Sequence, residues 1–373
     1  MGNLTAISRF WCITLTFWSF LLTTVAAQAE GAYHCPTNPP PPVFVGDQSG
    51  NPAYCPQISS PAYPFGAGPK VLFDEAHNNW GKISPSPLAP TAGTYFALGE
   101  LLKADGYQLH INRRRLTAEI LQDYDMLVIV APLPGEYFLL SDEPNKVIPN
   151  PIAYSGVQAL DHEEVTAIRN WVSAGGSLLL NSEHVPFLNS VQNLLGAFQL
   201  KTAANVYDIM SSQPLKIAAP LSPLFQGRTP SEMVRSLPLV PGIGGGVNLI
   251  GGGTALTRFD LLSLGFTQTL SAGFALMQYN AFCRGVGPDV DTSGCEELLL
   301  ASTEGTILFA GAGASPMKAL TVGSGRVVVF TEFSTLTSLF DRSSLNGLPY
   351  GGLTDKSYTQ FILNSLHWLS RLI

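Results

Sequence analysis

The stretch "VLFDEAHNNWG", residues 71–81, changes from apolar to densely polar within one residue. Because an unpaired carboxylate is costly to bury, this change indicates a buried strand that reaches a solvent-filled edge. The polar part supplies two carboxylates, an imidazole, two amides and an indole, namely Asp74, Glu75, His77, Asn78, Asn79 and Trp80.

Two other apolar runs end in similar residue types. "SLLLNSEH" ends in Ser182, Glu183 and His184, and "RVVVFTEF" contains Glu332. In an open parallel sheet, ligands bind outside the carboxyl ends of the strands, where loops from neighbouring strands meet. The sequence therefore predicts one pocket built from three strand ends.

The chemistry of such a pocket follows from its residue types. Glu75 or Glu332 can act as a general base, and His77 or His184 can exchange protons near neutral pH. Amides and carboxylates beside an indole also suit a sugar, whose apolar face packs on the ring while its hydroxyls bond the polar groups. We expect Glu75, His77 and His184 to be catalytic, and the remaining predicted site residues to bind the ligand: Asp74, Asn78, Asn79, Trp80, Ser182, Glu183 and Glu332.

Several alternatives stay open at this point. Asp74 and Asn78 can simply cap turns, His77 can bond a loop carbonyl, and Trp80 can cover the sheet edge. A metal-dependent hydrolase could use His77, His184 and nearby carboxylates, although no H-E-x-x-H or H-x-H spacing occurs. The chain also lacks the G-x-S-x-G motif of serine hydrolases, and a purely structural role in the cell envelope remains an option.

The elements that must position these residues alternate between strand and helix from Lys70 onward. Strands are predicted at "KVLFD", "YQLHI", "MLVIVAP" and "SLLLN". "LDHEEVTAIRNWVSAGG" predicts a helix with a capping box, because Glu164 follows Asp161 by three residues. "MKALTVGSGRVVVFTEF" predicts a hairpin, and Phe361, Leu363, Leu366, Leu369 and Leu372 form the apolar face of a last helix. This order predicts an α/β fold with a mostly parallel sheet, while residues 200–316 form a β/loop-rich insertion.

The first residues have the layout of a secretory signal peptide. One basic residue, Arg9, precedes an apolar run, and Ala27-Gln28-Ala29 supplies a cleavage site, so we expect residues 1–29 to be removed. Membrane contact is then limited to export, and the protein is secreted or periplasmic. An uncleaved anchor is the alternative. Residues 30–69 are so rich in Pro and Gly that we expect an extended lead-in without helix or strand ladder.

The net charge limits the classes of binding partner, and the number and spacing of the cysteines indicate disulfides rather than a metal site. The signal segment holds one of the 20 basic residues and none of the 27 acidic ones, so the remaining chain has a net charge of −8. This disfavours nucleic acid. We expect a small polar ligand as partner and predict no cofactor. In an oxidising compartment the four remaining cysteines are best paired as Cys35 with Cys55 and Cys283 with Cys295, among three connectivities; a zinc site lacks the C-x-x-C spacing.

The combined pattern resembles a known family. The segments that carry the likeness are "DEAHNN", "DGYQL", "YDMLVIVAP", "EEVTAIRNWVSAGGSLLLNSEHVPF", "GSGRVVVFTEF" and "NSLHWLSRLI". They resemble exported bacterial proteins of unknown function in the class I glutamine amidotransferase-like superfamily, which also contains the trehalose-utilisation-type proteins. The likeness covers residues 70–200 and 317–373.

The resemblance implies a flavodoxin-like three-layer αβα sandwich for residues 70–373, with a ligand site at the strand ends and carbohydrate as a suggested ligand. The sequence departs from the superfamily in one respect. Amidotransferases carry a cysteine nucleophile on a tight turn, whereas "NSEHVP" stands at the comparable turn here. We therefore expect no cysteine-dependent amidotransferase activity.

Overall fold

The centre of the fold is made by strands whose side chains are apolar on both faces. In the computed structural model, β4 (Met126–Val130) and β7 (Ser177–Asn181) are buried throughout, and β2 (Lys70–Asp74) is buried except at Lys70. Runs of this kind belong inside a parallel sheet, because such a sheet is covered on both faces. The structure describes residues 32–43, 48–140, 142, 147–182, 186–187, 189–198, 200, 217, 220–237, 306–307, 317–330, 333–341 and 347–373.

These strands belong to a seven-stranded sheet with the order β3-β2-β4-β7-β10-β9-β8. Strands β3, β2, β4, β7 and β10 run parallel, whereas β9 is antiparallel to β10 and β8 is antiparallel to β9. The mostly parallel sheet and the late hairpin are therefore confirmed. The remaining strands of the sheet are β3 (Gln108–Asn112), β8 (Thr306–Ile307), β9 (Met317–Val322) and β10 (Gly325–Phe330).

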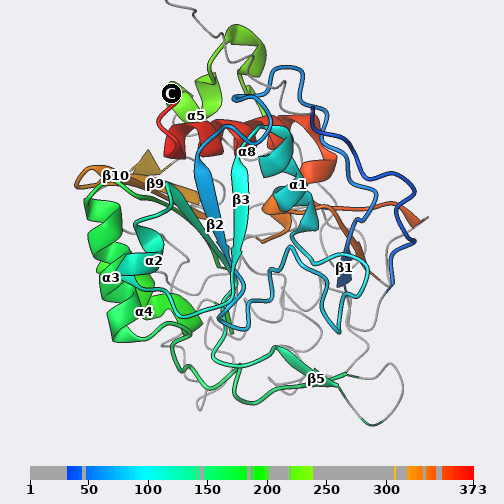
Figure 1. Ribbon diagram of the computed structural model, residues 1–373, viewed down its shortest axis with the longest axis vertical. Coiled ribbons are helices and arrows are strands. Elements are labelled where there is room, and N and C mark those ends of the chain that lie inside the picture. The colour runs from blue at the N-terminus through cyan, green and yellow to red at the C-terminus, as the bar shows by residue number, and fades with distance from the viewer. Residues whose placement is uncertain are drawn as a thin grey trace, which may run out of the picture. The chain divides into compact units, whose positions relative to one another are not determined.

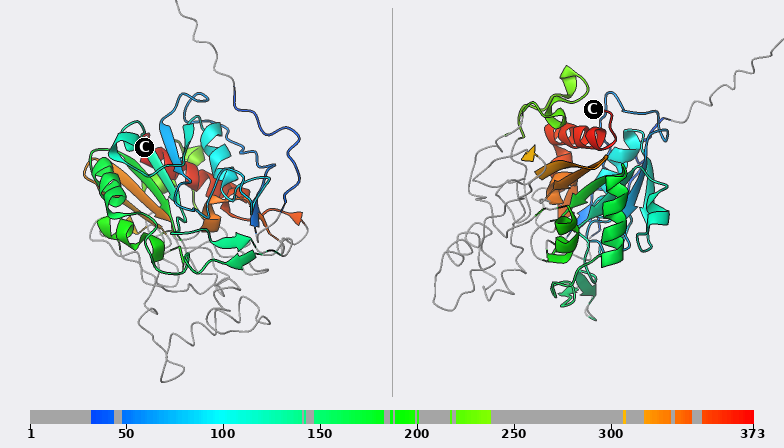
Figure 2. Two further views of the ribbon diagram at one scale, coloured as in Figure 1. Left: turned by 60° about the horizontal axis from the view of Figure 1, so that its bottom comes forward. Right: turned by 90° about the vertical axis from the view of Figure 1, so that its left-hand side faces the viewer.

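Helices pack on both faces of the sheet, because successive strand residues point in opposite directions. Val71 and Phe73 join one hydrophobic cluster together with residues of α1 (Phe96–Ala104) and α8 (Lys356–Leu369). Leu72 joins a second cluster with residues of α3 (His162–Ser173) and α4 (Gln192–Ala197). We call the side of the second cluster the α3 face. The short α2 (Ala118–Leu121) contacts α3, and the arrangement can be followed in Figures 1 and 2.

The predicted capping box at the start of α3 is confirmed. The Asp161 Oδ1 atom accepts a hydrogen bond of 2.9 Å from the Glu164 amide, and the Asp161 amide donates one of 3.1 Å to Glu164 Oε2. These two bonds satisfy amides that have no partner inside the helix. The helix is thereby fixed at its first turn, and this is the turn that approaches β2.

The apolar face predicted for the last helix is buried with one exception. Phe361, Leu363, Leu366 and Leu369 lie in the core beside α1 and the sheet, but Leu372 is 39% exposed. The prediction was wrong at Leu372 because α8 ends at Leu369. Arg371 then adopts a positive φ of 64°, which turns the chain away from the helical path.

The lead-in contains a strand, contrary to the expectation of no ladder. β1 (Gln48–Gly50) pairs antiparallel with β11 (Leu339–Asp341), and the Asn51 amide donates to the carbonyl of Ser338 over 2.9 Å. The strand β1 forms because it pairs with β11, which lies far away in the sequence. The composition of residues 30–69 alone could not indicate this partner. The predicted disulfide between Cys35 and Cys55 is present, with Cα atoms 5.3 Å apart.

The other described elements are short. They are β5 (Phe138–Leu140), β6 (Val147–Pro149), α5 (Pro223–Gln226), η1 (Asn189–Val191), η2 (Pro230–Glu232), η3 (Phe333–Leu336) and η5 (Gly352–Thr354). No helix within the described ranges is long and apolar enough to cross a membrane. The predicted signal peptide, the pair Cys283 and Cys295, and most of the predicted insertion lie outside the described residues.

Candidate functional site

The carboxylate at the end of β2 is buried and fully engaged. Asp74 has no exposed surface, and its Oδ1 accepts a 2.8 Å hydrogen bond from Asn112 Nδ2 at the end of the neighbouring β3. The Ala76 amide adds a longer contact of 3.4 Å to the same oxygen. Parallel pairing of β2 with β3 sets Asp74 opposite Asn112, so the sheet register itself builds this contact. Pairing with β3 therefore fixes the Asp74 carboxylate through Asn112.

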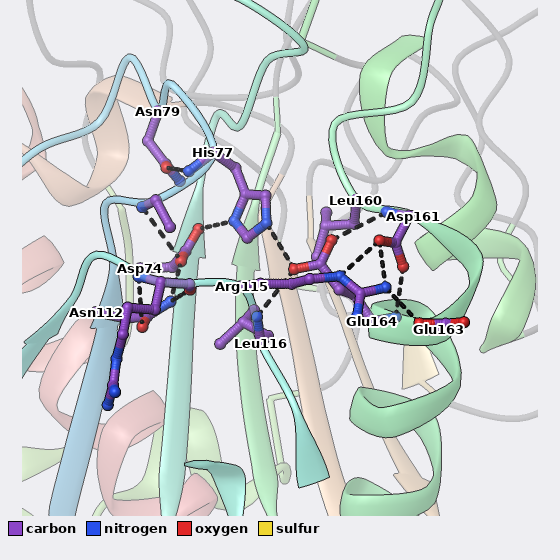
Figure 3. Close-up of polar contacts among 12 residues, drawn as sticks. Asp74, His77, Asn79, Asn112, Arg115, Leu116, Leu160, Asp161, Glu163 and Glu164 are labelled. Carbon is purple, nitrogen blue, oxygen red and sulfur yellow. Dashed lines mark hydrogen bonds and ion pairs between the residues drawn. The ribbon is translucent and has the colours of Figure 1, made fainter. Parts of the chain in front are cut away.

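His77 lies between two carboxylates. Its Nδ1 is 2.7 Å from Asp74 Oδ2 and its Nε2 is 2.9 Å from Glu164 Oε1, as Figure 3 shows. Burial of the ring lowers its pKa. The hydrogen bond and charge of Asp74, followed by those of Glu164, act in the opposite direction and raise the pKa of His77 to about 9. His77 is thus an imidazolium at neutral pH, and both of its ring nitrogens donate.

The Glu164 carboxylate accepts hydrogen bonds from two parts of the molecule, and the sequence predicted only the one in the capping box. Its Oε2 completes the capping box at Asp161, while its Oε1 accepts from His77 and, over 2.9 Å, from the amide of Leu116. We call Asp74, His77 and Glu164 the buried triad. The contact between His77 and Glu164 spans 87 residues, so no local sequence pattern could have revealed it.

The loop that carries His77 crosses the ends of the central strands. The His77 carbonyl accepts from the Leu133 amide over 2.8 Å, and the Trp80 amide donates over 3.0 Å to the carbonyl of Ala131, just beyond β4. Asn79 fixes the turn between them, because its Oδ1 accepts from the His77 amide (3.0 Å) and its Nδ2 donates to Val130 O (3.2 Å). The side chain of Asn79 therefore stabilises the loop by connecting it to the end of β4.

Two residues at these strand ends have left-handed backbone conformations. Asn78 has φ 47° and Ala131 has φ 42°. Asparagine tolerates this region, whereas alanine is strained there, and such strain is concentrated at functional sites in proteins. Glycine is required beside them at Gly81, because a Cβ at that position would lie 2.1 Å from Val130 Cγ1.

Glu75 organises the same loop further along. Its side chain is only 4% exposed, and its Oε1 accepts from the amides of Ile83 (2.9 Å) and Ser84 (2.8 Å). Arg113 approaches the other oxygen at 3.5 Å. A carboxylate that accepts two backbone N–H bonds is held in one orientation, so Glu75 closes the loop between β2 and α1.

Trp80 is half-buried at this edge. Its ring centroid lies 5.1 Å from that of Tyr137 and 5.8 Å from that of Phe138, with the rings steeply inclined in both pairs. Such edge-to-face contacts hold an aromatic ring in a defined orientation. Next to it, Lys82 forms an ion pair of 3.4 Å with the more exposed Glu136. This part of the edge thus combines a fixed indole with charged side chains.

Ser182 follows β7 and differs from its neighbours. Its amide continues the parallel ladder by donating to Phe330 O over 3.0 Å. Its side chain is almost wholly buried, yet Oγ has no hydrogen-bond partner among the described residues. The preceding Asn181 is engaged differently, since its Oδ1 accepts from the Tyr95 hydroxyl of the β2–α1 loop over 2.9 Å. Among the residues that the structure describes, the buried Ser182 hydroxyl therefore has no acceptor or donor.

The structure brings together some predicted residues and leaves others untested. Asp74, Glu75, His77, Asn79 and Trp80 share one loop and one edge of the sheet. Glu183, His184 and Glu332 lie outside the described residues, so their convergence with His77 stays a prediction. The part of the chain that the structure describes contains no cluster of three or more His, Cys, Asp or Glu side chains arranged to hold a metal.

A separate hollow of about 570 Å³ lies between the lead-in and the end of α1. It is not lined by any of the predicted strand-end residues. Its walls are aromatic and proline-rich and include the Cys35–Cys55 bridge, and the residues are Ala32, Tyr33, Cys35, Cys55, Pro56, Gln57, Ile58, Ser59, Pro61, Tyr63, Pro64, Phe65 and Ala104. The hollow is thus distinct from the predicted site.

Comparisons with known proteins leave the identity open. No protein-family model matches the sequence, and no curated protein matches it. Among solved structures, a cytoplasmic protein of Salmonella typhimurium is 11% identical with TM-score 0.42, over 81% of this chain and 98% of the other.

A ThuA-like protein of Bacteroides uniformis is 11% identical with TM-score 0.34, over 84% of this chain and 94% of the other. An exo-beta-1,4-mannosidase of an Opitutaceae bacterium is 11% identical with TM-score 0.34, over 81% of this chain and 36% of that enzyme. At these scores none of the likenesses assigns a fold or a function.

Proposed function

We propose that this chain is an exported α/β protein that binds a carbohydrate or a similar polar small molecule at the carboxyl edge of its sheet. The observation that carries the proposal is Trp80, a half-buried indole fixed by Tyr137 and Phe138 and flanked by the charged pair of Lys82 and Glu136. An indole with open surface beside polar groups is the combination that packs on a sugar ring and bonds its hydroxyls.

The buried triad supports this role by making the edge rigid. Asp74 is anchored to the sheet and Glu164 to the first turn of α3, so the imidazolium of His77 joins a strand to a helix. The His77 carbonyl and the Trp80 amide are then bonded to the chain after β4. A site held on rigid elements loses less conformational entropy when it binds.

Binding is favoured over catalysis by His77 or Glu75. A general base needs a free lone pair within reach of a ligand atom. Both nitrogens of His77 face carboxylates, and Glu75 Oε1 accepts two backbone amides. In this proposal His77 is a positioning residue, and the ligand is contacted by Trp80 and by the side chains around it.

We extend the proposal to family and location. The helices on both sides of the sheet support a flavodoxin-like three-layer αβα sandwich of the class I glutamine amidotransferase-like superfamily. The Cys35–Cys55 bridge supports an oxidising compartment, and therefore a secreted or periplasmic protein, because disulfides are rare in reducing ones.

The test is a binding measurement with neutral mono- and oligosaccharides. Titration calorimetry on the wild type should detect at least one sugar, and Trp80→Ala should weaken its binding by about tenfold or more, equivalent to roughly 1.4 kcal/mol. Trp171→Ala is the matched control, because Trp171 is also a partly buried indole but lies on α3. The proposal fails if no sugar binds the wild type, or if both variants bind it equally.

A further inference from the structure

The hollow between the lead-in and the end of α1 has largely aromatic walls. Its volume of about 570 Å³ lies within the range of small-molecule sites in proteins, roughly 300–1,000 Å³. Tyr33, Tyr63 and Phe65 contribute aromatic rings to it, and three other lining residues are prolines. The ring centroids of Tyr33 and Phe65 lie 6.1 Å apart, and their planes are inclined by 52°. Because the two rings are inclined rather than stacked, they do not cover each other's faces.

Hydrogen bonds and the disulfide hold these walls in place. The Tyr63 hydroxyl donates to Ser370 Oγ over 3.3 Å, and the Tyr33 hydroxyl donates to Glu100 Oε2 over 2.8 Å. Burial, followed by the hydrogen bond and charge of Glu100, raises the pKa of Tyr33 above its usual value, so this hydroxyl stays a donor. The Cys35–Cys55 bridge joins two segments of the wall. A site that is formed in advance loses less conformational entropy when it binds.

The charged side chains behind the walls already have partners. They contact the walls through the Tyr33 hydroxyl, the Ala62 amide and the Ser60 carbonyl. Their pairs are Glu100 with Lys103 at 2.7 Å, Asp105 with His367 at 2.7 Å and Glu232 with Arg228 at 2.6 Å. None of the described residues that line the hollow itself is charged at neutral pH. Because a charge that is buried without a counter-charge is costly, these walls favour a neutral ligand.

Two exposed polar side chains line the same hollow, those of Gln57 and Ser59. An amide and a hydroxyl can form hydrogen bonds with one or two ligand hydroxyl groups. A monosaccharide carries more hydroxyl groups than these two side chains can satisfy, whereas a simple phenol carries one. The combination of aromatic walls and two neutral polar groups therefore matches a phenol better than a sugar.

We propose that this hollow is a second ligand site, which binds a neutral aromatic molecule with a hydroxyl group. The ligand ring packs against Tyr33, Tyr63 and Phe65, and its hydroxyl bonds Gln57 or Ser59. The hollow is lined by the lead-in and by Ala104, and Trp80 is not among its lining residues. The inference therefore goes beyond the proposed function and does not depend on it.

The experiment is titration calorimetry of the whole chain with three probes: 4-methylphenol, its saturated counterpart 4-methylcyclohexanol, and the anion 4-hydroxybenzoate. We expect 4-methylphenol to bind about threefold or more tightly than 4-methylcyclohexanol, because aromatic pairs attract each other beyond the effect of buried area. The anion should bind no more tightly than 4-methylphenol, since the walls supply no counter-charge.

Phe65→Leu removes one aromatic wall and keeps an apolar side chain. It should weaken the binding of 4-methylphenol by about threefold and leave that of 4-methylcyclohexanol unchanged. Because Phe65 is 39% exposed, the variant should fold like the wild type, which its melting temperature checks. Tyr124→Leu is the matched control, since Tyr124 is a partly buried aromatic residue that packs against His110 and the cluster of the α3 face. This control should bind all three probes as the wild type does.

Four results would overturn the inference. The first is that no probe binds, and the second is that 4-methylphenol and 4-methylcyclohexanol bind equally. The third is tighter binding of 4-hydroxybenzoate than of 4-methylphenol, which would contradict the neutral class of ligand. The fourth is that Trp80→Ala weakens the binding of 4-methylphenol and Phe65→Leu does not, because the probe would then occupy the sheet edge. None of the first three results bears on the sugar site at Trp80, which its own titration tests.

Discussion

The buried triad predicts that the protein loses stability as the pH rises from about 6.5 to 9. In the folded state the pKa of His77 is raised to about 9, whereas a histidine in an unfolded chain titrates near about 6.5. Between these values the folded protein keeps a proton that the unfolded chain has released. The contribution of His77 is therefore complete below about 6.5, declines with rising pH, and is lost above about 9.

The size of this contribution follows from the shift. One pKa unit corresponds to about 1.36 kcal/mol, so a shift from about 6.5 to about 9 gives roughly 3 kcal/mol of unfolding free energy at pH 6. The His77 side chain is 10% exposed, so solvent screens it little. His77→Gln removes the titrating group and leaves two buried carboxylates facing an amide. The difference in stability between wild type and variant should be larger at pH 6 than at pH 10 by roughly 3 kcal/mol.

Equilibrium unfolding in urea at constant ionic strength, from pH 6 to pH 10, measures this difference. The control is His110→Gln, which removes an exposed histidine from β3, the strand next to β2, and should leave the pH dependence unchanged. If the stability gap between wild type and His77→Gln is the same at pH 6 and pH 10, His77 is not held as a cation, and the account of the triad is refuted.

Three further predictions follow. Glu164→Gln keeps an acceptor for the Asp161 amide but removes one charge, so the pKa of His77 should fall in an NMR titration; an unchanged value would show that Glu164 does not act on the ring. Asn78→Val should lower stability by about 1–2 kcal/mol in thermal unfolding and Asn78→Gly should not, because position 78 has φ 47° and valine is strained there; equal effects would contradict this. Reduction of the Cys35–Cys55 bridge, which closes a separation of 20 residues, should cost up to about 3 kcal/mol, and an unchanged melting temperature in dithiothreitol would argue against it.

The sequence was most informative where local patterns decide the structure. The buried strands β4 and β7 are continuous apolar runs, and the start of α3 is set by Asp161 and Glu164 within a single turn. Such features depend on residues a few positions apart, so they can be inferred without knowing the tertiary fold.

Contacts between distant segments were beyond the reach of such patterns. "DEAHNNW" was correctly placed at a strand end, but the sequence could not show that Glu164 would occupy the second nitrogen of His77. The strand β1 was missed because its partner lies near residue 340.

The pairing of β1 with β11 also constrains the order in which the molecule can be completed. Asn51 donates to the Ser338 hydroxyl across a separation of 287 residues, and Tyr63 donates to Ser370 across 307. Asn51 and Tyr63 can therefore dock only after residues 338 and 370 have been synthesised. Until then the segment that contains β1 has no strand to pair with, and it is accessible to chaperones and proteases.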